Sequence, residues 1–151
     1  MLASHDRQFM CGYSLSPASL STLPQGARLV LPWLNGATFS VLVHQSGAAV
    51  FTACFRNAGA VAAYIDQHFD RVLLVAAGER WPDGTLRPAC EDEWGAGAVI
   101  AMLNMSCSSE AQAAADTYRA VQANLLASVM KCRSGRELRS VSQTILTGPA
   151  T

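Results

Sequence analysis

The sequence predicts an α/β fold, a three-layer α/β/α sandwich on a mostly parallel, mixed sheet. Three apolar segments have the composition of buried strands, and a segment with helical spacing follows each of them. Strand, helix, strand, helix, strand, helix is the order of right-handed crossover units with helices on both faces of a sheet. The composition is 50% hydrophobic and 15% charged, which favours a compact globule over disorder.

The chain has 151 residues, which fits one domain able to bury roughly two-thirds of its unfolded surface. We expect an irregular segment over residues 1–27, where Ser, Pro and Gly are frequent. The α/β domain is expected over residues 28–138. The remaining residues, 139–151, are expected to form a disordered tail.

Charge and cysteine content exclude several classes of function. Eleven basic residues balance eleven acidic ones, so no overall field would attract nucleic acid or an acidic membrane. No apolar run approaches the ~20 residues of a membrane span, and the first residues do not resemble a signal peptide, which favours a cytoplasmic protein. Five scattered cysteines form no Cys-x-x-Cys pair, so we expect reduced, packed thiols and no zinc knuckle.

The first predicted strand is short and apolar, from Arg28 to Pro32, where proline ends it. The following stretch, LNGATFSVLVHQSG, predicts a helix that Gly47 stops, with Asn35 and Gly36 as a turn or helix cap. The second strand is predicted from Ala48 to Phe55, because β-branched and aromatic residues occur there with little alternation.

The second predicted helix follows Asn57, which we expect to be its N-cap. Its apolar residues recur at helical spacing: Val61, Ala62, Ile65 and Phe69. The segment from Arg71 to Gly78 is the clearest buried strand in the chain.

A long polar loop is expected after the third strand, with Pro82-Asp83-Gly84 as a turn. A third helix is expected to start with acids in its first turn. A long alanine-rich helix is then predicted from about Ser109 to Cys132, with one apolar stripe made of Tyr118, Val121, Leu125 and Val129.

Polar residues follow each predicted strand, at the sheet edge where such folds bind ligands. They are Asn35 and Thr38 after the first strand, Arg56 and Asn57 after the second, and Glu79, Arg80, Glu91 and Asp92 after the third. A helix N-terminus beside an arginine forms a competent phosphate or carboxylate site. Carboxylates on the same edge are suited to Mg²⁺, which takes one or two acidic ligands plus waters and substrate oxygens.

Purely structural roles remain open for the same residues. Glu91, Asp92 and Glu93 would each contribute about 0.3–1 kcal/mol by complementing a helix macrodipole, without any metal. Arg56 fits a solvated helix start, and Asn35 fits a cap as well as a ligand contact. Glu79 and Arg80 fit a surface pair worth less than about 1 kcal/mol.

Other catalytic motifs are missing from the sequence. GAGAVI, from Gly95, has the first two glycines of a dinucleotide fingerprint without the third, and it follows a loop. No cysteine has an arginine at phosphatase-loop spacing, and no Gly-x-Ser-x-Gly elbow occurs. His5, His44 and His68 lie in a ragged terminus or on expected helices. The sequence therefore offers no obvious side-chain nucleophile. This favours either a metal-activated water as the nucleophile or a site of which one part is missing.

Five stretches, in order and at matching spacing, resemble the 2-phosphosulfolactate phosphatase family, the ComB-like proteins. They are GYSLSPASL, GARLVLPWLNGATFS, CFRNAGAVAAYI, VLLVAAGERWPDGTLRPACEDEWGAGAVI and SGREL. The resemblance implies a mixed α/β sandwich and Mg²⁺-dependent hydrolysis of a small, acidic phosphomonoester such as 2-phosphosulfolactate.

The resemblance also implies roles for individual residues. Substrate contacts fall on Asn35, Gly36, Thr38, Arg56 and Asn57, and acidic functional positions on Glu79, Glu91 and Asp92. From the chemistry of carboxylates, we expect these three acids to be catalytic, with Glu91 and Asp92 as metal ligands. From its place on the same edge, Arg80 is a further candidate for substrate binding.

The chain departs from the family pattern in three places. Trp33 and Leu34 occupy positions that are usually Ser and Pro. An N-terminal portion with a first strand and an acidic loop has no counterpart, so the resemblance covers the middle and later parts of the family and predicts a sandwich truncated at its N-terminus. The residues after SGREL also differ.

Three hypotheses about function follow. The first is a Mg²⁺-dependent phosphatase for a small anionic phosphorylated substrate. The second is a catalytically inactive or incomplete ComB-like fragment that binds a ligand or a partner chain. A nucleotide-binding module is the third, although its glycine signatures are missing. No nucleic acid or membrane partner is expected, and a homo-oligomer is left open.

Overall fold

The computed structural model describes residues 20–28 and 34–139. The chain divides into two compact units, Met1–Val50 and Phe51–Thr151. In neither is a described helix long and apolar enough to cross a bilayer.

In the first unit, the described helix is α2 (Leu34–Gln45). It starts just before Asn35, so Asn35 and Gly36 lie in its first turn. The Ser40 hydroxyl donates to the Gly36 carbonyl at 2.8 Å. Gly47 follows the helix with φ of 81°, as the sequence predicts for a stop, because glycine tolerates this left-handed conformation. The predicted strand from Arg28 to Pro32 lies outside the described residues, apart from Arg28.

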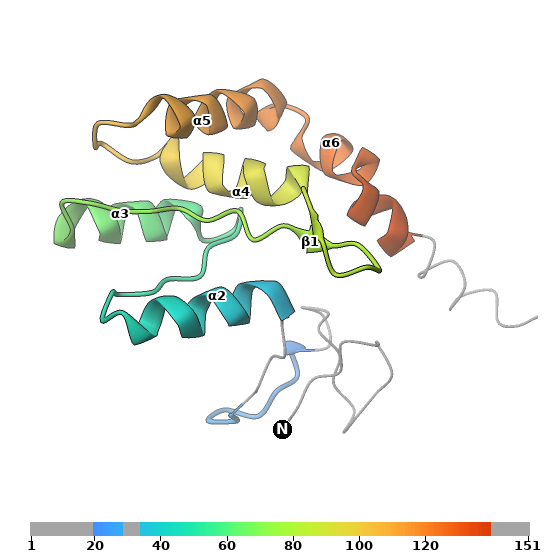
Figure 1. Cartoon of the computed structure of the whole chain (residues 1–151), viewed down its shortest axis with the longest axis horizontal. Coiled ribbons are helices and arrows are strands. Elements are labelled where there is room, and N and C mark those ends of the chain that lie inside the picture. The colour runs from blue at the N-terminus through green and yellow to red at the C-terminus, as the bar shows by residue number, and fades with distance from the viewer. Residues whose placement is uncertain (1–19, 29–33, 140–151) are drawn as a thin grey trace, which may run out of the picture. The chain divides into compact units, whose positions relative to one another are not determined.

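The second unit is mainly helical (Figure 1). Its helices are α3 (Ala58–His68), α4 (Cys90–Ile100), α5 (Ser109–Gln122) and α6 (Leu125–Lys131), and residues 133–139 are also helical. Between α3 and α4 lies an antiparallel hairpin of β1 (Glu79–Arg80) and β2 (Leu86–Arg87). The predicted helices after Asn57 and at the acidic turn are thus confirmed as α3 and α4.

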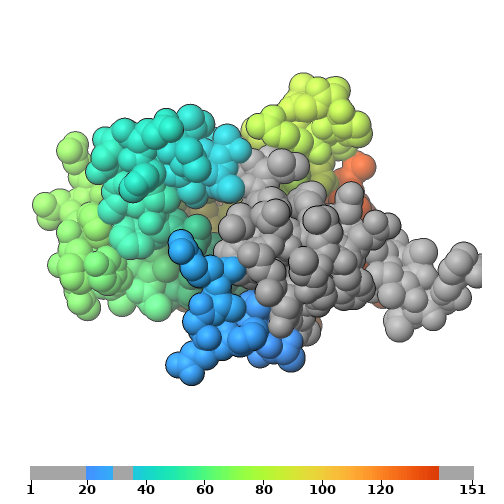
Figure 2. All heavy atoms as spheres, turned by 90° about the horizontal axis from the view of Figure 1, so that it is seen from below, coloured from blue at the N-terminus to red at the C-terminus, as the bar shows by residue number. Residues whose placement is uncertain are grey.

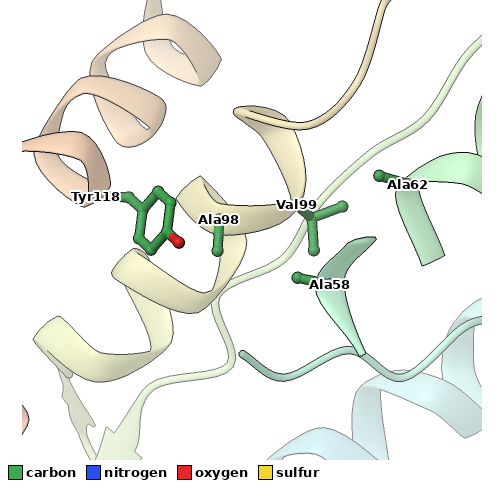
Figure 3. Packing of buried hydrophobic residues seen from close by; sticks show 5 residues of the cluster. All are labelled: Ala58, Ala62, Ala98, Val99 and Tyr118. Atoms are coloured by element: carbon green, nitrogen blue, oxygen red, sulfur yellow. The ribbon is translucent and has the colours of Figure 1, made fainter. Parts of the chain in front are cut away.

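The core of this unit lies where α3, α4 and α5 meet. Figure 3 shows Val99 of α4 next to Ala58 and Ala62 of α3, while Ala98 lies on the side of α4 nearer Tyr118 of α5. Three of these five side chains are alanine, so the helices approach closely. At Gly97 the backbones of α4 and α5 come so near that a Cβ atom would meet the carbonyl of Ala114.

The predicted sandwich with a mostly parallel sheet is wrong. The sheet formed by the described residues has two strands, and they run antiparallel. Neither 48–55 nor 71–78 forms a strand, and Leu73, expected to be buried, is 85% exposed. An apolar, β-branched composition indicates that a segment is suited to a buried strand. A strand also needs a neighbouring strand with which it can form hydrogen bonds. The described chain supplies none to these two segments.

The single helix predicted from Ser109 to Cys132 is also wrong in one respect. It is divided into α5 and α6 by a turn at Ala123 and Asn124. Asparagine competes with helical hydrogen bonding through its own side chain, which favours a break at such a position. Of the predicted stripe, Tyr118 is buried, and the other three residues are half-buried.

The predicted turn at Pro82-Asp83-Gly84 is confirmed, and it closes the hairpin. The N–H of Trp81 donates to the Thr85 carbonyl at 2.9 Å, and the Asp83 carboxylate accepts from the N–H and hydroxyl of Thr85. Gly84 has φ of 84°. Figure 2 shows atoms of this hairpin, in yellow-green, at the molecular surface.

Candidate functional site

The site that best fits the sequence predictions lies at the start of α4. Glu91, Asp92 and Glu93 occupy its first turn, as predicted. The N-cap residue is Ala89, which has no side-chain group to bond the first backbone N–H groups. Negative charge here is favoured by the helix macrodipole. The structural and the catalytic interpretation of these acids both remain compatible with their placement.

Asp92 is distinguished from its neighbours by its environment. Its side chain is half-buried, and this burial raises the pKa of Asp92 above its ordinary value. A hydrogen bond from the backbone of Gly78 opposes the rise, and the charge of Glu91 adds to it. A partly desolvated carboxylate near a like charge is a common feature of sites that bind cations or transfer protons.

Gly78 is held in a conformation that only glycine adopts easily. Its φ is 66°, and it is buried against β2. A Cβ atom at this position would lie 2.9 Å from Cδ1 of Leu86 and 3.2 Å from the carbonyl oxygen of Arg87. Glycine therefore allows the backbone before β1 to pass close to β2 while it bonds the Asp92 carboxylate.

Glu91 has a different environment from Asp92. Its charge acts on the thiol of Cys132. Burial is the main cause that raises the pKa of Cys132 to about 11, and the charge of Glu91, followed by that of Cys90, raises this pKa further. Glu91 thus lies near the end of α6, whereas Asp92 contacts the backbone before β1. No group of three or more His, Cys, Asp or Glu side chains suited to a metal occurs within 20–28 and 34–139.

Glu79 and Arg80 form β1, next to the Gly78 contact. Glu79 is half-buried and is paired in register with Arg87, while Arg80 is paired with Leu86. The Arg80 guanidinium donates to the Gly84 carbonyl at 2.7 Å, so it braces the hairpin turn. Glu79 and Asp92 are therefore linked through a single residue, Gly78, which precedes one and bonds the other.

Arg56 and Asn57 lie at the start of α3. Arg56 is exposed. Asn57 occupies the N-cap position, as predicted, but its side chain makes no capping hydrogen bond. Instead its Oδ1 accepts from the N–H of Cys54 at 2.7 Å, and its Nδ2 donates to the Thr52 carbonyl at 3.1 Å. Asn57 therefore fixes the preceding loop.

The other candidates, Asn35, Gly36 and Thr38, lie in α2 of the first unit. Thr38 is exposed, and Gly36 is half-buried. The convergence of these three with the residues of the second unit stays a prediction. Within the second unit, α3 and α4 both begin towards the end where the hairpin lies (Figure 1).

The comparison with family models decides the assignment of the chain. The model described as 2-phosphosulpholactate phosphatase matches residues 8–144, which is most of the sequence. The chain belongs to the 2-phosphosulfolactate phosphatase family. The resemblance found in five sequence stretches is thereby confirmed. No curated protein and no solved structure matches the chain.

In this 2-phosphosulfolactate phosphatase family member, two features of the site escaped the sequence reasoning. One is the backbone of Gly78 as the partner of Asp92. The other is a cluster that joins the hairpin to residues 133–139 and consists of Trp81, Arg87, Arg133 and Glu137. The position of Gly78 directly after an apolar segment was a signal for the contact with Asp92. The cluster joins residues far apart in the chain, and no local sequence pattern indicates such a contact.

Proposed function

We propose that the chain is a Mg²⁺-dependent phosphatase that hydrolyses a small phosphorylated acid of the 2-phosphosulfolactate kind. The family match over residues 8–144 carries this proposal. The chemistry of the α4 start supports it, because a half-buried carboxylate with a raised pKa suits cation binding.

The start of α4 would offer Mg²⁺ the half-buried carboxylate of Asp92. This ion keeps several waters and takes one or two protein carboxylates plus phosphate oxygens, so a large cluster of acids is not needed. Asp92 would hold it, with Glu91 close enough to interact electrostatically. Bound Mg²⁺ would supply charge neutralisation on the phosphoryl oxygens and a more acidic water.

The other residues have roles in binding and orientation. Exposed Arg56 is suited to an anionic group of the substrate, because a guanidinium binds phosphate, sulfonate or carboxylate with two parallel hydrogen bonds. Glu79, next to the Gly78 backbone, would accept a proton from water. Arg80 would contribute positive charge near the hairpin. Asn35, Gly36, Thr38 and Asn57 are retained as candidates for substrate contacts.

The experiment is phosphate release by the full chain, with Mg²⁺ or with a chelator. Substrates are 4-nitrophenyl phosphate, 2-phospholactate and 2-phosphosulfolactate. We expect Mg²⁺-dependent release, fastest with the substrate that carries both carboxylate and sulfonate. Asp92→Asn should lower kcat by about a hundredfold, the usual contribution of one catalytic group. Its control is Asp70→Asn, which removes an exposed carboxylate outside α4.

Arg56→Ala tests the substrate side of the proposal. It should raise KM about tenfold, whereas the exposed Arg71→Ala should not. Calorimetric titration with Mg²⁺ provides a readout independent of turnover. If the wild type binds Mg²⁺ and phosphate but releases no phosphate from any of the three substrates, the non-catalytic binding alternative replaces this proposal.

A further inference from the structure

A cluster of four side chains connects the hairpin to the helical residues 133–139. The Arg133 guanidinium lies 4.7 Å from the ring centre of Trp81, and that of Arg87 lies 5.7 Å from it. Glu137 accepts from both arginines, at 2.8 Å from Nε of Arg133 and 3.4 Å from Nη2 of Arg87. We call these four residues the tether. Trp81 thus packs beside two cations that share one carboxylate.

Arg87 is the least exposed member of the tether. Its side chain is 11% exposed, compared with 51% for Glu137. A guanidinium with so little access to water depends on its protein partners, since leaving it unpaired costs more than losing an exposed pair. The Arg87–Glu137 ion pair, at 3.4 Å, joins the hairpin to residues 133–139, whereas the shorter Arg133–Glu137 pair, at 2.8 Å, lies within one helical segment.

Arg87 leads directly to the candidate site. Its carbonyl oxygen lies 3.2 Å from the Cβ position of Gly78, and its Cα is paired with that of Glu79. Gly78 in turn hydrogen-bonds the Asp92 carboxylate through its backbone. A continuous series of contacts thus runs from Glu137 through Arg87 and Gly78 to Asp92.

We propose that Glu137 is a positioning residue, which holds β2 through Arg87 and so keeps the Gly78 backbone against the Asp92 carboxylate. This inference rests on the proposed function for its catalytic meaning. What it claims physically is that Glu137 maintains the contact between the Gly78 backbone and the Asp92 carboxylate. A carboxylate fixed by a backbone donor is restricted in orientation, and orientation is what a ligand to a metal or water must have.

Hydrogen exchange at the Gly78 amide, followed by NMR on the full chain, measures that contact. In Glu137→Gln, we expect exchange at Gly78 to be at least about threefold faster than in the wild type. The matched control is Asp116→Asn, which neutralises another carboxylate paired with an arginine, Arg119, at 2.7 Å in α5. Asp116→Asn should leave exchange at Gly78 unchanged. Unchanged exchange in Glu137→Gln would overturn the proposal.

A double variant identifies the route. In an Arg87→Gln background, Glu137→Gln should add little further exchange at Gly78, because its partner is already lost. Full additivity would mean that Glu137 does not act through Arg87, and the proposal would fail. Arg87→Lys keeps the charge and should give an intermediate rate, which separates loss of the tether from general unfolding.

Kinetics distinguish this inference from the proposed function. Glu137→Gln should lower kcat about threefold or more and leave KM within about twofold, since substrate contacts remain. If exchange at the Gly78 amide were faster in Glu137→Gln but kcat were unchanged, Glu137 would have no role in catalysis. A wild type without phosphatase activity would sink the proposed function instead, while exchange at Gly78 would still decide whether Glu137 holds this backbone.

Discussion

Gly97 of α4 lies directly against the backbone carbonyl of Ala114 in α5. A Cβ atom on Gly97 would collide with this carbonyl and would lie 2.9 Å from Cβ of Tyr118. Neither obstacle is a flexible side-chain end, so the helices would have to separate. Gly97 is itself buried, as are residues 98–100.

The first prediction concerns Gly97→Ala. Overpacking at this crossing should lower the free energy of unfolding by about 1–3 kcal/mol, measured by urea denaturation. Gly95→Ala is the control on the same helix, since nothing lies within 4 Å of its Cβ position. It should raise stability by up to about 1 kcal/mol through helix propensity. Equal effects of the two variants would show that the helices do not approach at Gly97.

The second prediction concerns pH and Asp92. Burial raises the pKa of Asp92 in the folded state, so the folded chain binds this proton more tightly than the unfolded chain. Stability therefore falls as pH rises from the ordinary value of 3.8 through the raised one. Asp92→Asn keeps an acceptor for Gly78 and removes this penalty. Measured without Mg²⁺, it should be more stable relative to the wild type at about pH 7 than at about pH 3.

Asp83 supplies a control with the opposite sign. Hydrogen bonds from Thr85 lower the pKa of Asp83, so its contribution is present above the ordinary value and is lost as pH falls through the lowered one. Asp83→Asn should therefore lose stability at about pH 7 relative to about pH 3. The same pH trend in both variants would contradict the assigned environments.

The third prediction concerns thiol reactivity. Burial, with the charge of Glu91, raises the pKa of Cys132 to about 11, so on the order of one thiol in a thousand is ionised at about pH 8. Iodoacetamide should therefore modify Cys132 at least about tenfold more slowly than the exposed Cys54 and Cys107, followed by mass spectrometry. Glu91→Gln should accelerate modification of Cys132 alone. Equal rates at the three cysteines would contradict the raised pKa of Cys132, and an unchanged rate at Cys132 in Glu91→Gln would contradict the effect assigned to Glu91.

The helices show what sequence patterns can predict. Residues Ala62 and Ile65 recur at helical spacing and are both buried, and α3 starts directly after Asn57 as expected. The acidic first turn of α4 could also be predicted, because acidic residues before an apolar run indicate the start of a helix. The strand predictions were wrong because the composition of a segment carries no information about whether a neighbouring strand is available to pair with it.

The candidate site was predicted as a set of residues rather than as an arrangement. Joint binding of one metal by Glu91 and Asp92 stays a prediction. Neighbouring residues on a helix are rotated by about 100°. This rotation separates the contacts of the two residues, so that Glu91 affects Cys132 and Asp92 contacts Gly78. The tether could not be predicted, because Arg87 and Glu137 are fifty positions apart.

The break between α5 and α6 has a thermodynamic consequence. No residue of α6 is buried, whereas α5 contributes Ala115 and Tyr118 to the interior. Stability is thus unevenly distributed, and sub-global opening of the C-terminal helices requires less free energy than unfolding of α3, α4 and α5. Such an opening would also break the ion pair between Glu137 and Arg87 of the hairpin. The tether can therefore be lost while most of the helical structure persists.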